Sequence, residues 1–297
     1  MKLNLFSAQR VASVYCGIVW ICILVEIPLN CWALFIYQTE SAELAQISAR
    51  QTSNCQTDSE ALRALTRYLA VEVPHRKNHE YFLLPVFSIL RPTSLQVIKE
   101  GGDCSYKSRV LVSLLRHRKI PAKKLSLHTP AGIGSHAAVL AHTERGDYVI
   151  DALYGIVFDH EDGSPISLDD LQQRPEILPA IIEREIARGN TKARNYSCER
   201  YVYTDVRSWD LEQYPSTAAL RGVLVSVFGK SAIDGLPRPP FMAEPALIMM
   251  WASAGLIAIL STPVALGRFI ARRRMGRPPS QDVVGSSSLA GTSPPAF

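Results

Sequence analysis

The chain has 297 residues, with 32 Lys and Arg against 27 Asp and Glu, for a formal net charge of +5. Because 47% of the residues are hydrophobic and 20% are charged, the composition excludes a wholly disordered chain. Six cysteines are too few for a disulfide-stapled scaffold. A positive charge alone would suggest a polyanionic partner such as nucleic acid, so the location of the charges matters.

Two long apolar segments predict transmembrane helices over residues 11–37 and 245–267. The first has 27 residues and a single charge, Glu26, and the second has 23 residues and none. A bilayer core of ~30 Å needs about 20 helical residues, so each segment is long enough to span it. The alternatives are a cleaved signal peptide and a buried core helix. The first run exceeds a signal peptide's usual length and no small-x-small site follows it, and five arginines follow the second.

The charges predict how these helices are oriented. Residues 38–244 contain 25 basic and 25 acidic residues, so the positive excess lies entirely outside this segment. The basic flanks predict a cytoplasmic N-terminus over 1–10 and a basic, disordered cytoplasmic tail over 268–297. Residues 38–244 are then extracytoplasmic, as in a two-pass protein of the inner membrane with a periplasmic domain. A nucleic-acid partner loses its support.

Within residues 38–244, spacing and turn residues predict an α+β domain. Helical spacing covers 41–72, and a short apolar run covers 83–90. A helix begins near Cys104, and short strands follow at 124–128, 137–141 and 148–153. The turn 143–147 joins the last two strands as a hairpin. A helical pattern over 169–188 is interrupted by two prolines, Pro175 and Pro179. One helix packed on an antiparallel sheet defines the class.

Three residues in this domain form a candidate nucleophile, base and orienting carboxylate. Cys104 opens the helix, His136 opens the second strand and Asp151 lies late in the third. A helix N-terminus and a neighbouring imidazole both favour the reactive thiolate, and a carboxylate can fix the tautomer of the imidazole. A hairpin centred near residue 143.5 would set His136 and Asp151 directly opposite each other. His128 and His142 are competing bases, and neither has an acid so well placed.

The motifs around these residues occur in a recognisable order. They are Gly102-Asp103-Cys104, Lys119-Ile120-Pro121-Ala122, Ser135-His136-Ala137, and Val149-Ile150-Asp151 followed by Tyr154-Gly155. This stretch, about residues 98–160, resembles the transglutaminase-like superfamily of cysteine enzymes. The resemblance implies a papain-like core with Cys104 as nucleophile, His136 as base and Asp151 as orienting acid. The chain departs from the family at Ala138, where an aromatic residue is common, and at Ala152-Leu153, where proline is common, which concerns substrate preference.

The resemblance implies acyl transfer through a thioester on a peptide or another amide-bearing substrate. Water as acceptor gives a protease or amidase, whereas an amine gives a transglutaminase, and the sequence leaves both open. The oxyanion would be held by the backbone N–H of Cys104 and a second donor, for which Tyr81 and Gln96 are candidates. No metal-ligand spacing and no phosphate-binding glycine loop occurs, so we expect neither metal nor cofactor.

The sequence leaves open two alternative functions and one possible disulfide. A cell-wall amidase of the NlpC/P60 type also uses Cys then His, although the Ile-Pro-Ala segment and the Asp favour the transglutaminase-like interpretation. A catalytically silent protein could assist assembly of a membrane complex, for example in polysaccharide export, together with membrane-protein partners. Cys55 and Cys198 could pair, which would leave Cys104 free as a nucleophile requires.

Overall fold

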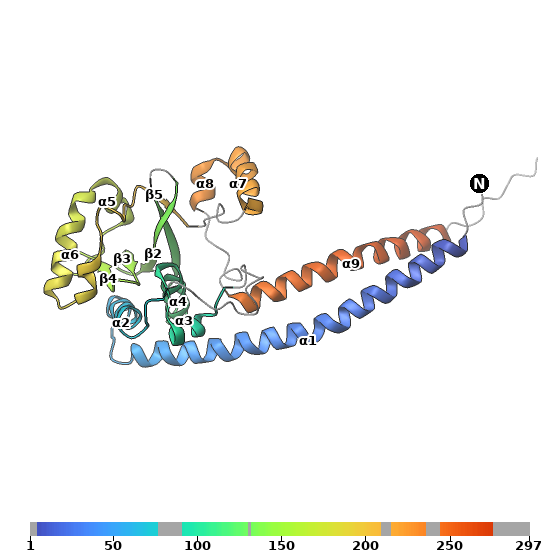
Figure 1. Cartoon of the computed structure of the whole chain (residues 1–297), viewed down its shortest axis with the longest axis horizontal. Helices are drawn as coiled ribbons and strands as arrows, with labels where there is room; N and C mark the ends of the chain where they lie inside the picture. The colour runs from blue at the N-terminus through green and yellow to red at the C-terminus, as the bar shows by residue number, and fades with distance from the viewer. Residues whose placement is uncertain (1–4, 77–90, 130–131, 209–214, 236–243, 276–297) are drawn as a thin grey trace, which may run out of the picture. The chain divides into compact units, whose positions relative to one another are not determined.

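A computed structural model describes the chain except for residues 1–4, 77–90, 130–131, 209–214, 236–243 and 276–297 (Figure 1). The chain divides into two compact units, of which the first comprises Met1–Ile27 and Ser253–Phe297 and the second comprises Pro28–Ala252. The second unit combines helices with an antiparallel sheet, which confirms the α+β class. The apolar run predicted at 83–90 lies outside the described residues. Of the tail predicted to be disordered over 268–297, residues 268–275 instead continue a helix, and residues 276–297 lie outside the described residues.

Among the residues that the structure describes, two helices are long and apolar enough to cross a membrane. They belong to α1 (Leu5–Gln51) and α9 (Pro245–Met275), and the candidate spans within them are Ser13–Gln51 and Pro245–Leu266. Only 11% and 6% of their most apolar windows are buried within the chain. A core helix of a soluble protein would have most of these side chains buried, so the burial pattern separates these two helices from an ordinary core helix.

Inside the first unit, polar groups of α1 and α9 bond to each other. The Ser253 hydroxyl donates to the Glu26 carboxylate, and the Tyr15 hydroxyl donates to the Leu260 carbonyl at 2.7 Å. Glu26 therefore faces the other apolar helix. A carboxyl group in an apolar segment is costly unless it has such a partner, so the contact accounts for the one charge in this stretch.

The sheet of the second unit has five antiparallel strands in the order β4-β3-β2-β1-β5. The strands are β1 (Ala122–His128), β2 (Gly134–Thr143), β3 (Gly146–Asp151), β4 (Ile156–Phe158) and β5 (Asp205–Arg207). The three predicted strands correspond to β1, β2 and β3. Strands β4 and β5 have three residues each, which is too short for a periodic signal.

The helices of the second unit follow local capping and proline signals. They are α2 (Asp58–Val71), α3 (Ser94–Glu100), α4 (Cys104–His117), α5 (Leu168–Gln173), α6 (Leu178–Ala187), α7 (Pro215–Phe228) and α8 (Lys230–Gly235), with short 3₁₀ turns at Pro175–Ile177 and Thr191–Asn195. The helical pattern predicted over 41–72 is interrupted, because Thr57 forms a capping box with Glu60 and starts α2 anew. The pattern over 169–188 breaks between α5 and α6, as the prolines indicate.

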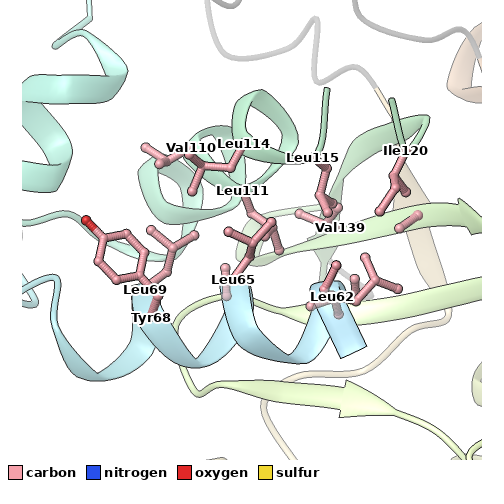
Figure 2. Packing of buried hydrophobic residues seen from close by; sticks show 14 of the residues in the cluster. Leu62, Leu65, Tyr68, Leu69, Val110, Leu111, Leu114, Leu115, Ile120 and Val139 are labelled. Atoms are coloured by element: carbon pink, nitrogen blue, oxygen red, sulfur yellow. The ribbon is translucent and has the colours of Figure 1, made fainter. Parts of the chain in front are cut away.

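Alternate residues of the sheet face two different hydrophobic clusters. Val139 and Ile150 pack with leucines of α2 and α4, as Figure 2 shows for Leu65 and Leu111. Leu140, the neighbour of Val139, packs in a second cluster with residues of α5 and α6. Because both faces of β2 and β3 are buried, their runs 137–141 and 148–150 are apolar throughout rather than alternating.

One buried lysine fastens α4 to α2. The Lys107 ammonium, with 1% of the residue exposed, donates to the carbonyls of Leu69 at 2.7 Å and Val73 at 2.6 Å. These carbonyls lie at the C-terminal end of α2, which carries a partial negative charge. Burial lowers the pKa of Lys107 to about 8, so the ammonium is still the main form at pH 7.

Replacing this lysine should loosen the contact between the two helices. Lys107→Met keeps the apolar stem but leaves both carbonyls without their donor, so we expect ~2 kcal/mol of destabilisation and a melting temperature lower by about 4–8 °C. The measurement is thermal unfolding of the full chain in nanodiscs at pH 7, followed by near-ultraviolet circular dichroism. The control Lys192→Met, at an exposed position, should change little. Equal melting temperatures for the two variants would contradict the anchoring role.

Candidate active site

Cys104 is the first residue of α4, as predicted, and its thiol is free and partly exposed. The side chain of Asp103 caps the helix by accepting from the N–H of Tyr106 at 2.9 Å. At a helix start the first N–H groups, here those of Cys104 and Ser105, lie outside the intrahelical ladder. The thiol therefore lies at the positive end of the helix dipole, next to N–H groups that can face an oxyanion.

Two glycines allow the chain to approach this helix start closely. Gly101 has φ +101°, and a Cβ there would lie 2.7 Å from the carbonyl oxygen of Pro74. A Cβ on Gly102 would lie 2.7 Å from Cγ1 of Val97. Any side chain at either position would displace the segment that leads into Cys104.

A serine one turn along α4 fixes the helix on strand β2. The Ser108 hydroxyl donates to the carbonyl of Ala137 at 3.2 Å, and the contact is buried. Residues four apart lie on the same face of a helix, so Ser108 and Cys104 face the same strand. The residue before Ala137 is His136, and the bond therefore sets the thiol beside the imidazole.

His136 and Asp151 form a buried hydrogen-bonded pair. Nε2 of His136 lies 2.5 Å from Oδ2 of Asp151, and their side chains are 1% and 0% exposed. The other carboxylate oxygen, Oδ1, accepts from the backbone N–H groups of Leu153 at 2.9 Å and Tyr154 at 3.0 Å. The turn after β3 thus holds the carboxylate in place and directs one of its oxygens at the imidazole.

The pair forms in a different register from the predicted one. The hairpin pairs Thr143 with Gly146, which centres it at 144.5, so His136 and Asp151 are not directly opposite. Gly146 has φ +121°, a conformation that favours glycine, and the turn accordingly lies over Glu144 and Arg145. Continuing the register places Asp151 diagonal to His136 on the same face, within reach of a side-chain hydrogen bond.

The environment of His136 stabilises its charged form. Burial alone penalises the imidazolium, but the charge and hydrogen bond of Asp151 outweigh that penalty, and a hydrogen bond to Cys104 adds to them. Together they raise the pKa of His136 to about 10. Because Nε2 faces Asp151, Nδ1 is the nitrogen that remains for the Cys104 sulfur. An imidazolium at neutral pH is the partner that a thiolate requires.

Three tyrosines surround the imidazole, and sequence reasoning missed their role. The Tyr201 ring stacks on His136 with centroids 4.1 Å apart, and the Tyr196 ring approaches it edge-on at 6.5 Å. The hydroxyls of Tyr154 and Tyr201 lie 2.9 Å apart. The rings of Tyr154, Tyr196 and Tyr201 shield the His136–Asp151 bond from water, which strengthens it. The closely spaced tyrosines at 196, 201 and 203 were the sequence signal that could have indicated this aromatic cluster.

The competing bases have other partners. His128 is buried, and its Nδ1 lies 3.2 Å from the carbonyl of Ser126. His142 pairs with Asp147 at 2.7 Å in an exposed contact at the end of the β2–β3 hairpin. The structure therefore brings His136, rather than either alternative, together with Cys104 and a buried acid.

The remaining predicted candidates lie apart from this group. Tyr81 is outside the described residues, and Oε1 of Gln96 accepts from the N–H of Thr93 as part of the α3 capping box. Cys55 and Cys198 are free thiols that pack against different hydrophobic clusters, so the disulfide between them does not form. Among the described residues, no three or more His, Cys, Asp or Glu side chains gather as metal ligands would.

Comparison with known proteins gives one structural likeness. No protein-family model matches the chain, and no curated protein matches it significantly. Among solved structures, a Cytophaga hutchinsonii protein described as a "putative cysteine protease" matches with a TM-score of 0.32 and 16% identity. The match covers 38% of this chain and 37% of that protein. A likeness this partial carries no functional conclusion.

The raised pKa of His136 predicts how stability depends on pH. A group whose pKa is higher in the folded chain contributes its full stability below its unfolded pKa, about 6.5 for histidine. That contribution falls as the pH rises and is lost through about pH 10. Asp151→Asn removes the charge but keeps an acceptor, so its deficit in melting temperature should shrink as the pH rises from 6 to 10.5.

Thermal unfolding of the full chain and this variant across that range tests the sign. Asp147→Asn is the matched control, because it alters an exposed His–Asp pair on the same hairpin. Such a pair contributes little, so the control should stay close to the unmodified chain at every pH. A deficit for Asp151→Asn that is constant from pH 6 to 10.5 would show that the pair does not bind the proton as described.

Proposed function

We propose that the chain is a membrane-anchored, transglutaminase-like cysteine protease, amidase or acyltransferase with a papain-like core. One observation supports this above all others. A thiol at a helix start interacts electrostatically with an imidazole whose Nε2 lies 2.5 Å from a fully buried carboxylate. In this proposal Cys104 is the nucleophile, His136 the base and acid, and Asp151 the residue that orients His136.

The first half of the proposed reaction forms a thioester. The Cys104 thiolate attacks the amide carbonyl carbon, and the electron pair of the C=O bond moves to oxygen. The N–H of Cys104 donates to that oxyanion. The intermediate collapses when the C–N bond breaks, and His136 gives its proton to the leaving amine. The acyl group is then held on sulfur, and the imidazole is neutral.

The second half returns the enzyme to its starting state. Neutral His136 takes a proton from water or from an acceptor amine, whose oxygen or nitrogen attacks the thioester carbonyl. The C–S bond then breaks, and sulfur leaves as the thiolate beside the imidazolium. Asp151 stays hydrogen-bonded to Nε2 throughout, so that Nδ1 keeps facing the sulfur. Water releases a carboxylic acid, and an amine gives a new amide.

Selective alkylation tests the proposed nucleophile. In the full chain in nanodiscs at pH 7, iodoacetamide should label Cys104 at least about tenfold faster than Cys55, because ordinary thiols are only a few per cent thiolate at this pH. His136→Ala should remove this advantage, as mapped by mass spectrometry. His142→Ala deletes another aspartate-paired histidine and should have no effect. Equal labelling of the two cysteines, unchanged by His136→Ala, would refute the activated thiolate.

The membrane part of the proposal is a two-pass topology with residues 38–244 on the extracytoplasmic side. The two apolar helices and the five arginines after residue 267 support it. Two reporters are used, one active only in the cytoplasm and one active only in the periplasm. After residue 297 only the cytoplasmic reporter should be active, whereas after Gly163, in an open turn, only the periplasmic reporter should be active. A periplasmic signal from the C-terminal fusion would overturn the orientation.

A further inference from the structure

Helix α7 (Pro215–Phe228) exposes an apolar surface that the proposed chemistry does not use. Of its 14 residues only Arg221 is charged. Val223, Val227 and Phe228 are 62%, 67% and 63% exposed. Val223 and Val227 are one turn apart (i, i+4), so their side chains lie on one side of the helix and form a stripe, which we call the α7 stripe. Phe228 lies about 100° farther round the helix and extends the apolar surface beside this stripe.

The length and polar groups of α7 fit the surface of a bilayer. Fourteen helical residues extend about 21 Å, too short for a hydrocarbon core of ~30 Å but typical of an interfacial segment. The exposed hydroxyl of Ser226 donates to the carbonyl of Val223 at 2.7 Å, so it is satisfied within the helix. Gly229, with φ +85°, ends the helix, and the exposed Lys230 follows, where a cation can meet lipid headgroups.

Chain continuity decides which partner covers this stripe. Residues 229–244 separate α7 from α9, one of the two helices apolar enough to cross a membrane. Sixteen residues extend at most about 56 Å, so α7 is tethered near the bilayer that α9 would enter. A stable protein interface needs about 20–30 residues from each partner, far more than this short helix offers.

We propose that α7 lies in the headgroup region of the same membrane, as a third contact beside the two apolar helices. This inference rests on the membrane anchoring of the proposed function. The partner is a lipid surface, recognised through apolar side chains and a flanking lysine.

Photo-crosslinking in nanodiscs of phosphatidylethanolamine and phosphatidylglycerol tests this contact. Benzoylphenylalanine replaces Val223 or Val227 in the full chain, and mass spectrometry identifies the adducts. Val71, a valine on α2 with 62% exposure, is the matched control. Ile259 of α9, 71% exposed, reports the anchoring itself. We expect lipid adducts at Val223, Val227 and Ile259, at least fivefold above those at Val71.

The other outcomes each overturn one of the two proposals. Lipid adducts at Ile259 but not on α7 reject the α7 contact alone, and so do chain-to-chain adducts from α7. No lipid adducts at Ile259 reject the anchoring. Hydrogen–deuterium exchange of the unsubstituted chain tests the same contact without substitutions, so a folding defect in the variants cannot affect its result. Amides of α7 should exchange several-fold more slowly in nanodiscs than in amphipol, and equal rates would also reject the contact.

Discussion

The candidate site depends on one constraint, the burial of the Asp151 carboxylate. A carboxylate that is removed from water must accept hydrogen bonds on both oxygens, because a single contact does not offset the desolvation free energy of the charge. The turn after β3 fills one oxygen with two backbone N–H groups, and His136 fills the other. The Asp151 contact thereby orients the imidazole and favours its charged form, and Nδ1 is the nitrogen left for Cys104 at the start of α4. The position of Cys104 matters because this pair is already in place.

The sequence predicted this pair and the turn between its strands, although the expected register was wrong by two residues. His136 and Asp151 are an odd number of residues apart, so a hairpin can bring their side chains to one face. Moving the hairpin centre from 143.5 to 144.5 shifts the pairing by two residues, which preserves the face and changes a direct neighbour into a diagonal one. The expected proximity of His136 and Asp151 is therefore observed. The register of β2 and β3 depends on the conformation of Gly146, which hydrophobic periodicity does not indicate.

What the sequence did not predict was set by contacts between distant segments. Lys107 would ordinarily be assigned to the surface, since buried lysines are rare and need a partner. Its partners are carbonyls of α2, 34 and 38 residues earlier, and no local pattern marks them. Tyr201 stacks on an imidazole 65 positions away, and it lies near the short β5, which pairs with β1. Periodicity reports which face is buried, but it does not report which neighbour fills it.

Helix α4 connects the candidate site to the segments that lead into the apolar helices. Its first turns hold Cys104, Lys107 and Ser108, which serve the thiol, the bond to α2 and the bond to β2. Its last turns receive two further bonds: the Ser48 hydroxyl at the end of α1 donates to the carbonyl of Leu114 at 3.0 Å, and Ser113 donates to Glu244, just before α9, at 3.0 Å. Both contacts are buried, so breaking either would leave an unsatisfied polar group in the core. The C-terminal turns of the helix that presents the thiol are therefore hydrogen-bonded to both of these segments, and a displacement of either segment would act directly on α4.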